Sequence, residues 1–274
     1  MARRGRSRRR GGKGNSALGK VFARLTITAV LGVVGFLFYL NMTSEVVKLD
    51  ETTMCPIGKP PTHVYAVLID STEALPEKSA RQAIIKFRNI LNAAPMNSKI
   101  TLYAVRSGNE SHAMPIASVC KPDNGEAASQ LTANPALIKK HYDQFIGSLN
   151  AHLESLVEQP GSNTSPIIES LQSAVIESFE GNPNADSKTI IVISDMIQNS
   201  DLYSFYRLKP DFQSYQRSSK SSGQGILSLK GIRVELLLVP RTPPTGTRQD
   251  LVRFWSEFLS EYGALSGSSL EPLS

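Results

Sequence analysis

The stretch His63-Val-Tyr-Ala-Val-Leu-Ile-Asp70-Ser-Thr72 decides the fold, because an apolar, β-branched run stops there at a carboxylate and two hydroxyls. Continuous apolar character over residues 64–69 is typical of a strand covered on both faces, as in parallel sheets flanked by helices. Ligands of such sheets bind just beyond the carboxyl ends of the strands, where Asp70 stands. Residues 189–195, Thr-Ile-Ile-Val-Ile-Ser-Asp, repeat this design. The two acidic strand ends predict one shared polar site.

Strand and helix patterns alternate along the rest of the chain. Strands are expected at residues 99–105, 114–120 and 232–239, the second of them antiparallel in an edge hairpin. Amphipathic helices are expected at residues 75–91, 134–159 and 166–179, and after Thr247, which can cap the last of them with Asp250 three residues on. This alternation predicts the α/β class: a Rossmann-like, mostly parallel central sheet with helices on both faces, in one domain.

Positive charge is concentrated at the N-terminus. The chain has 274 residues and a formal net charge of +6, but residues 1–24 hold nine of the 30 Lys and Arg residues and no acid. The remaining 21 basic and 24 acidic residues give a net charge of −3. A basic patch for nucleic acid is therefore confined to this short tail, and no nucleic-acid partner is expected.

Residues 25–44 carry no charge and approach the ~20 residues that a membrane-spanning helix needs. A cleaved signal peptide is the rival interpretation. The apolar stretch is long for a signal peptide and no Ala-x-Ala-like site follows it, so an uncleaved anchor over residues 25–40 is favoured. The basic tail before it predicts a cytoplasmic N-terminus, in contact with anionic headgroups, and an extracytoplasmic main domain, periplasmic in a bacterium.

The expected domain plan is a basic tail (1–24), a transmembrane helix (25–44), a linker (45–61), the main domain (62–262) and a flexible C-terminal tail (263–274). The chain has two cysteines, Cys55 and Cys120, both on the predicted outer side. An even number of cysteines in an oxidising compartment favours a disulfide between them.

Three polar segments occur at strand ends or helix starts: residues 70–74, residues 161–166 and Ser194-Asp195. Their order resembles that of a von Willebrand factor A-type (vWA-like) domain, over residues 62–262, and the edge hairpin suits that fold. The resemblance implies a Rossmann-like sheet with a metal-ion-dependent adhesion site at its edge.

In that family the first loop reads Asp-x-Ser-x-Ser, which places Asp70 and Thr72 on the first two ligand positions. The third position falls on Ala74, which has no side-chain oxygen. Ser165 matches the family's isolated threonine, with Thr164 as a near alternative, and Asp195 matches the acid after the fourth main strand. The resemblance thus implies the metal site Asp70, Thr72, Ser165 and Asp195.

Oxygen ligands of this kind suit Mg²⁺ or Ca²⁺, and a carboxylate from a partner protein would complete the coordination shell. The alternative that stays open is a degenerate site, in which Asp70 and Asp195 cap helices or bind water.

The connector at residues 196–230 is far longer than the usual ~2–6 residues between a strand and its helix. Its aromatic residues alternate with basic ones; they are Tyr203, Phe205, Tyr206, Phe212 and Tyr215. One interpretation is a packed helix near residues 202–208 followed by a Ser-rich loop. The other is a recognition surface for a protein partner beside the metal edge, since aromatic and Arg residues are enriched at binding hot spots.

These features predict a membrane-anchored, extracytoplasmic binding or scaffolding module for a protein partner, and not an enzyme. The sequence shows no nucleophile and base motif, no Gly-x-Ser-x-Gly and no P-loop. The alternative is a metal-assisted phosphoryl hydrolase with Asp70 as nucleophile, similar to haloacid-dehalogenase-like enzymes. That family has a second Asp where this chain has Thr72.

Overall fold

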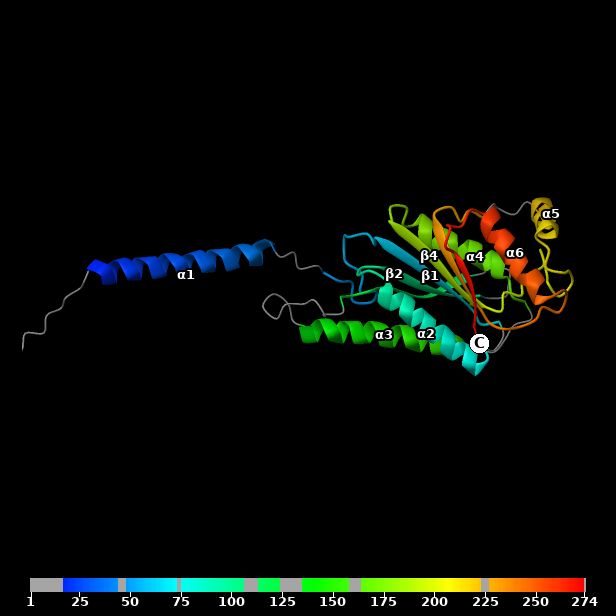
Figure 1. The fold of residues 1–274 in the computed structure, drawn as a ribbon, viewed down its shortest axis with the longest axis horizontal. Helices are drawn as coiled ribbons and strands as arrows, with labels where there is room; N and C mark the ends of the chain where they lie inside the picture. The colour runs from blue at the N-terminus through cyan, green and yellow to red at the C-terminus, as the bar shows by residue number, and fades with distance from the viewer. Residues whose placement is uncertain are drawn as a thin grey trace, which may run out of the picture. The chain divides into compact units, whose positions relative to one another are not determined.

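The computed structural model describes residues 17–43, 48–72, 75–105, 113–123, 135–157, 164–222 and 227–273. The chain divides into two units, Met1–Val47 and Lys48–Ser274. The first unit contains helix α1 (Ala17–Thr43) (Figure 1). Its segment Lys20–Tyr39 is long and apolar enough to cross a membrane, with a mean hydropathy of 2.1. None of the apolar window in this segment is buried.

The second unit is built on a mostly parallel sheet. Its strands are β1 (His63–Asp70), β2 (Lys99–Val105), β3 (Ala113–Cys120), β4 (Ser187–Ser194), β5 (Ile232–Leu238) and β6 (Ser269–Pro272). Their order in the described part of the chain is β3-β2-β1-β4-β5-β6. Only β3 runs antiparallel to its neighbour, β2, so the predicted edge hairpin is confirmed.

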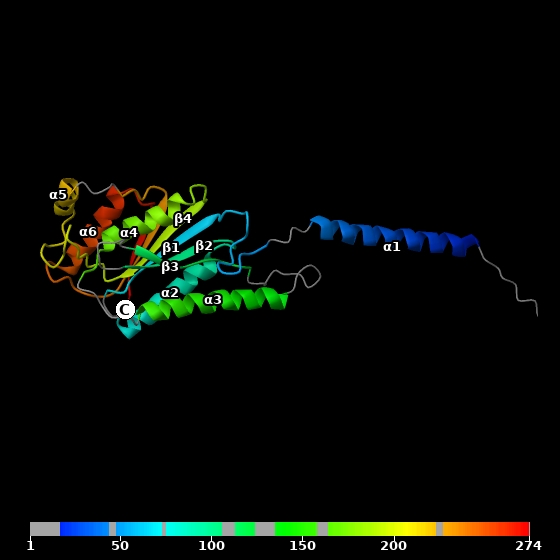
Figure 2. The ribbon, with the colours of Figure 1, turned by 180° about the vertical axis from the view of Figure 1, so that it is seen from behind.

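Helices cover both faces of this sheet, as Figures 1 and 2 show. Helices α2 (Glu77–Ala93) and α3 (Pro135–Val157) share one apolar cluster with the sheet, which includes Val67 and Ile69 of β1. The opposite cluster includes Ala66 and Leu68 and the helices α4 (Ile167–Val175), α5 (Phe212–Ser222) and α6 (Arg248–Glu261). Helix α4 continues as a π-helical turn, η1 (Ile176–Glu180). Successive residues of β1 thus point to opposite faces of the sheet, and each face is covered by helices. The predicted Rossmann-like α/β fold is confirmed.

The strand order places a switch point between β1 and β4. From β1 the chain moves outward to β2 and β3, and it then returns to β4 on the other side of β1. The carboxyl ends of β1 and β4 therefore lie side by side, with connections leaving in opposite directions. In open α/β sheets this position forms a crevice in which ligands bind.

The C-terminal segment differs from the expectation of a flexible tail over residues 263–274. Residues 269–272 form β6, which pairs in parallel with β5. Leu273 is 2% exposed, and its N–H donates to the carbonyl of Leu238 at 2.8 Å. Burial of this leucine and backbone pairing to the exposed edge of β5 hold the segment in place.

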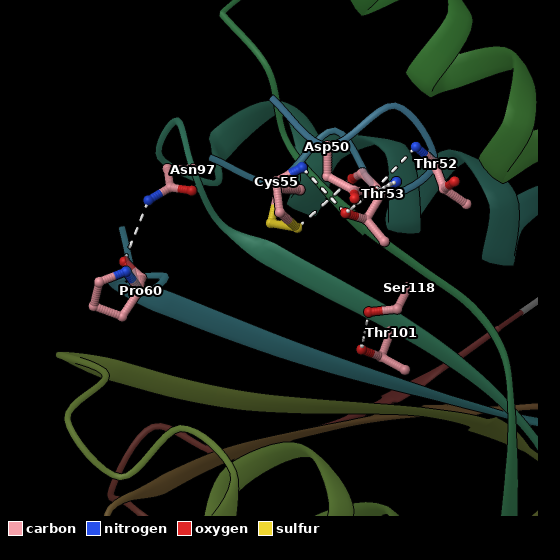
Figure 3. The surroundings of a disulfide bond; sticks show 9 residues. Asp50, Thr52, Thr53, Cys55, Pro60, Asn97, Thr101 and Ser118 are labelled. Carbon is pink, nitrogen blue, oxygen red and sulfur yellow. Dashed lines mark hydrogen bonds between the residues drawn. A yellow bond between two sulfur atoms is a disulfide. The ribbon is translucent and has the colours of Figure 1, made fainter. Parts of the chain in front are cut away.

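The predicted disulfide joins Cys55 to Cys120, with a Cα–Cα distance of 4.7 Å. Figure 3 shows the turn that carries Cys55, in which Asp50 Oδ1 accepts hydrogen bonds from the N–H groups of Thr52 (3.1 Å) and Thr53 (2.7 Å). The N–H of Cys120 also donates to the carbonyl of Thr53 at 2.7 Å. Part of the predicted linker is therefore fastened to the end of β3, and the compact unit begins at Lys48.

Candidate functional site

The carboxyl ends of β1 and β4 bring the two predicted acids to one edge of the sheet. Ile69 of β1 pairs with Ile193 of β4. Asp70 comes directly after Ile69 and Asp195 comes two residues after Ile193, so both acids stand at the same end of adjacent strands. Both carboxylates are buried: Asp70 is 5% exposed and Asp195 is 9% exposed. We call the residues around these two acids the tip site.

Asp70 accepts hydrogen bonds from hydroxyl groups on three segments of the chain. Thr72 donates to Oδ1 through its hydroxyl at 2.6 Å and through its N–H at 3.0 Å. Ser165 and Ser194 donate to Oδ2 at 3.0 Å and 2.8 Å. Hydrogen bonds to a carboxylate are stronger than those between neutral groups, so Asp70 fastens three segments at one point.

Asp195 has different partners. Its Oδ1 accepts from the N–H of Ile197 at 2.8 Å, and its Oδ2 lies 3.0 Å from Nη1 of Arg241 in an ion pair. Burial raises the pKa of Asp195 to about 6, the N–H of Ile197 opposes that rise, and the charge of Asp70 adds to it. The charge of Asp70 therefore acts on Asp195, although the two acids bind different groups.

The structure brings Asp70, Thr72 and Ser165 into direct contact and places Asp195 at the same sheet edge. Ala74, the third position of the predicted motif, lies outside the described residues. Ligation of Mg²⁺ or Ca²⁺ by these four residues stays a prediction.

Two members of the tip site were missed among the predicted site residues. Ser194 lies at the end of β4 next to Asp195, and its hydroxyl points to Asp70. Arg241 follows β5, the neighbour of β4, and pairs with an acid 46 residues before it. Its position just beyond the carboxyl end of an expected strand was a usable signal, because all parallel strands of the sheet deliver residues to the same edge.

As the structure arranges them, the oxygen atoms of the two acids are engaged by groups of this chain and do not form a coordination shell. Mg²⁺ requires near-octahedral coordination by oxygen atoms, and Ca²⁺ takes six to eight. Oδ2 of Asp195 is already paired with the guanidinium of Arg241, and Asp70 is satisfied by hydroxyl groups. Within the described residues, no group of three or more His, Cys, Asp or Glu side chains is placed to hold a metal.

A buried hydrogen-bond network supports the loop that follows β4. Gln198 is fully buried and donates to Oε2 of Glu169 at 2.8 Å, while its side-chain oxygen accepts from the N–H of Ile168 at 2.9 Å. Ser200 donates to the other oxygen of Glu169 at 2.5 Å. The loop after Asp195 is thereby tied to the first turn of α4.

The backbone beside Asp195 is strained. Met196 has a φ of 62° and is completely buried. A left-handed conformation is uncommon for residues other than glycine and persists where the surroundings hold it. Here the N–H of Met196 donates to the hydroxyl of Ser194 at 2.8 Å, and its carbonyl accepts from Nε1 of Trp255 at 2.9 Å. These bonds fix the direction in which the chain leaves the tip site.

The connector is packed rather than open, so the interpretation of its aromatic set as a recognition surface is wrong for four of the five rings. Those four are between 0% and 6% exposed and lie in the core: Tyr203, Phe205, Phe212 and Tyr215. The packed helix is α5 at Phe212–Ser222, whereas residues 202–208 form no helix and contain a turn at residues 205–207. The four rings pack against α6, where Phe254 lies 4.9 Å from Phe205 and 5.9 Å from Phe212 between ring centroids.

Tyr206 is the exception. It is 45% exposed, and Leu208 two residues later is 49% exposed. Burial raises the pKa of Tyr206, and the charges of Asp195 and Asp70 raise it further. An exposed aromatic residue therefore lies within electrostatic reach of both acids of the tip site.

No family model matches the chain. No curated protein matches it either.

Several solved structures are similar to this chain at a low level. An aerotolerance-related membrane protein from Bacteroides fragilis is 13% identical, with a TM-score of 0.33 and coverage of 75% of this chain and 92% of that one. The manganese-loaded Plasmodium vivax TRAP protein is 12% identical, with a TM-score of 0.35 and coverage of 70% and 61%. The SpRpn10 VWA domain is 12% identical, with a TM-score of 0.36 and coverage of 78% and 89%. Similarity at this level carries no argument about function.

The assignment of the fold rests on the molecule itself. The mostly parallel sheet with helices on both faces, the antiparallel β3 at its edge, and the Asp70-x-Thr72 loop that follows β1 are the features that the sequence resemblance implies. The unit from Lys48 onward therefore has a vWA-like fold.

Proposed function

We propose that this chain is a membrane-anchored module that binds a protein partner on the extracytoplasmic side through the surface beside its tip site. The observation that carries this proposal is the exposed segment Tyr206, Arg207 and Leu208, which we call the tip surface, next to two buried acids. Tyrosine and arginine are enriched among the residues that dominate the energy of protein interfaces.

The backbone of the tip surface is held in place by hydrogen bonds to neighbouring segments. Phe205 is buried, and its N–H donates to the carbonyl of Gln198 at 2.9 Å. The hydroxyl of Thr245 lies 2.6 Å from the carbonyl oxygen of Phe205 and 2.8 Å from that of Leu208, so its single O–H is shared between the two ends of the segment. A surface ordered before binding loses less conformational entropy when a partner docks, which favours affinity.

The charge beside the tip surface suits an acidic group on the partner. Arg207 is exposed and its guanidinium donates to the carbonyl of Ser200 at 2.8 Å. Complementary charge of this kind speeds association and selects partners.

Cross-linking in cells tests this function. A photoreactive benzoylphenylalanine in place of Tyr206 or Leu208, in the full chain, should give a discrete adduct with one protein on illumination. Ile85 on α2 is the matched control, since it is apolar and 57% exposed but lies on a helix of the opposite face. Equal adducts from all three positions, or adducts from position 85 alone, would contradict the proposal.

The anchor part of the proposal rests on α1 and on the basic residues before it. We propose that α1 remains uncleaved, spans the membrane once, and leaves the N-terminus in the cytoplasm, as the positive-inside rule favours. Protease added outside sealed cells should then degrade the domain, while a cytoplasmic marker protein survives. Survival of the domain together with the marker would contradict this topology.

We also propose that the chain is not an enzyme. The alternative, a phosphoryl hydrolase, needs Asp70 as an accessible nucleophile, whereas both oxygens of Asp70 accept hydroxyl hydrogen bonds and the residue is 5% exposed. Hydrolysis of p-nitrophenyl phosphate by the purified chain, lost on Asp70→Asn, would revive the hydrolase interpretation.

A further inference from the structure

The tip site carries two buried negative charges that require compensation. Asp70 ends β1, Asp195 directly follows the adjacent strand β4, and the two residues are 5% and 9% exposed. Two carboxylates buried at one edge of a sheet are costly unless a positive charge or enough hydrogen-bond donors offset them.

The two acids are compensated in different ways. Asp70 receives hydrogen bonds from the hydroxyls of Thr72, Ser165 and Ser194. Asp195 receives a full positive charge from Arg241, whose Nη1 lies 3.0 Å from Oδ2. Both acids thus have partners supplied by this chain.

We propose that the guanidinium of Arg241 is a built-in cation, which occupies the electrostatic role of a divalent ion at the tip site and makes the site independent of metal. A guanidinium is permanently charged and presents several donors in a plane that matches a carboxylate. It therefore supplies charge and hydrogen bonds together, without the coordination shell that a metal demands. Arg241 reaches the site because its segment continues from β5, directly beside β4.

Arg241 and a divalent ion exclude each other at this position. Both would neutralise Asp195, and two cations within a few ångströms of each other in a partly buried site repel strongly. A metal could approach only if the ion pair between Asp195 and Arg241 opened. The motif is also short of one oxygen, because alanine stands at position 74. The alanine at position 74 and the arginine at position 241 therefore both favour a site without a metal.

The sole tryptophan, Trp255, is a natural reporter for this site. Its Nε1 donates to the carbonyl of Met196, which directly follows Asp195. The full chain is purified in detergent, treated with EDTA, and melted with and without MgCl₂ or MnCl₂ while the fluorescence of Trp255 is followed. Binding of either ion to the native state raises the melting temperature, because ligands that bind only the folded state stabilise it.

The wild-type chain should melt at the same temperature with and without either ion. Arg241→Gln should melt lower without metal, and Mn²⁺ should raise its melting temperature. Arg241→Lys keeps the positive charge and should show no response to metal, which separates the effect of charge from that of side-chain shape. The double variant Arg241→Gln with Asp195→Asn should lose the metal response, since it removes the acid that attracts the ion.

The matched control is Arg253→Gln, which removes an arginine paired with a different buried acid, Asp250. This variant should show no metal response. Stabilisation of the wild-type chain as large as that of Arg241→Gln would overturn the proposal, and so would an Arg241→Gln variant that melts at one temperature in all buffers. Binding of free Mn²⁺, followed by its electron paramagnetic resonance signal, gives the same comparison without melting the protein.

Discussion

The hydroxyl of Ser165 donates to Oδ2 of Asp70 at 3.0 Å, across 95 residues of sequence. The N–H of Ser165 also donates to the carbonyl of Asn199 at 2.9 Å, and the N–H of Asn199 returns a bond of 2.8 Å to Ser165. The segment before α4 is thus joined to the end of β1 and to the loop after β4. The tip site is held together by its polar groups, and Asp70 is the acceptor that they share.

Replacing Asp70 by Ala should therefore destabilise the domain, although a strand-end residue is expected from the sequence to contribute little to the core. Three hydroxyl groups would lose their acceptor, and buried donors left without partners cost about 1–3 kcal/mol each before relaxation. We expect a net loss of roughly 2–4 kcal/mol in the free energy of unfolding, measured by urea denaturation.

Asp143→Ala is the control for this measurement. Asp143 has a side chain 60% exposed in a surface ion pair with Lys139, and such pairs contribute about 0–1 kcal/mol. A cost for Asp70→Ala no greater than that for Asp143→Ala would show that the hydroxyl groups find other partners, and the shared-acceptor interpretation would be wrong.

The disulfide between Cys55 and Cys120 should contribute substantially to stability. It closes a sequence separation of 65 residues, and a loop of this length corresponds to roughly 4 kcal/mol in the chain-entropy model. Reduction, or the double replacement by Ser, should lower the urea midpoint accordingly. Each single Ser variant should resemble the double variant, and identical midpoints with and without reductant would contradict the prediction.

The architecture could be predicted because its signals are local. The apolar run before Asp70 indicates a strand buried on both faces, and Val64 and Ile69 are each 1% exposed. The capping box of Thr247 and Asp250 marks the start of α6, and the structure contains it. Strand β6 has no such signal: it is four residues long and depends on pairing with β5 and on burial of Leu273.

The tip site could be predicted only in part. Residue types and order identified Asp70, Thr72 and Ser165, whose contacts the structure contains. The position of Arg241 just beyond an expected strand places it at this edge, but its pairing with Asp195 could not be predicted from neighbours in sequence, because the two residues are 46 positions apart. The burial of Tyr203 could not be predicted from the sequence either, since it depends on packing against α6. The ring centroids of Tyr203 and Phe254 of α6 are 6.2 Å apart.

Lys121 should prove important for stability, although lysine usually lies on the surface. It is 8% exposed, and its Nζ donates to the carbonyls of Leu91 (2.8 Å), Asn92 (2.8 Å) and Ala94 (2.6 Å) at the end of α2. Burial lowers its pKa. A cation at this position satisfies carbonyls that a helix end leaves without donors and interacts favourably with the helix dipole.

Lys121→Met keeps the length of the side chain and removes the donors, so we expect a loss of about 2–3 kcal/mol in the free energy of unfolding. Lys78→Met, at an exposed position on α2, the helix whose last carbonyls Lys121 binds, is the control and should change stability little. Hydrogen exchange should also accelerate at the C-terminal turn of α2 in Lys121→Met. Equal stability of the two variants would mean that the three carbonyls do not depend on Lys121.

Asp250 should make stability depend on pH in the acid range. The hydroxyl of Thr247 lowers its pKa most, with help from Lys209 and from the N–H of Thr247, to about 2 from an ordinary value of 3.8. Between these values the unfolded chain binds more protons than the folded chain, so stability rises with pH. The contribution of Asp250 is fully present above about pH 4 and is lost as the pH falls toward 2.

The measurement compares the melting temperatures of the wild-type chain and Asp250→Asn at several values of pH. The difference should be constant from neutral pH down to about 4 and should shrink as the pH approaches 2. In a Thr247→Val background the difference should be smaller throughout, because the hydroxyl that contributes most to the low pKa is gone. A difference in melting temperature that grew as the pH fell would contradict this prediction. It would mean that the folded state binds the proton more tightly than the unfolded chain does.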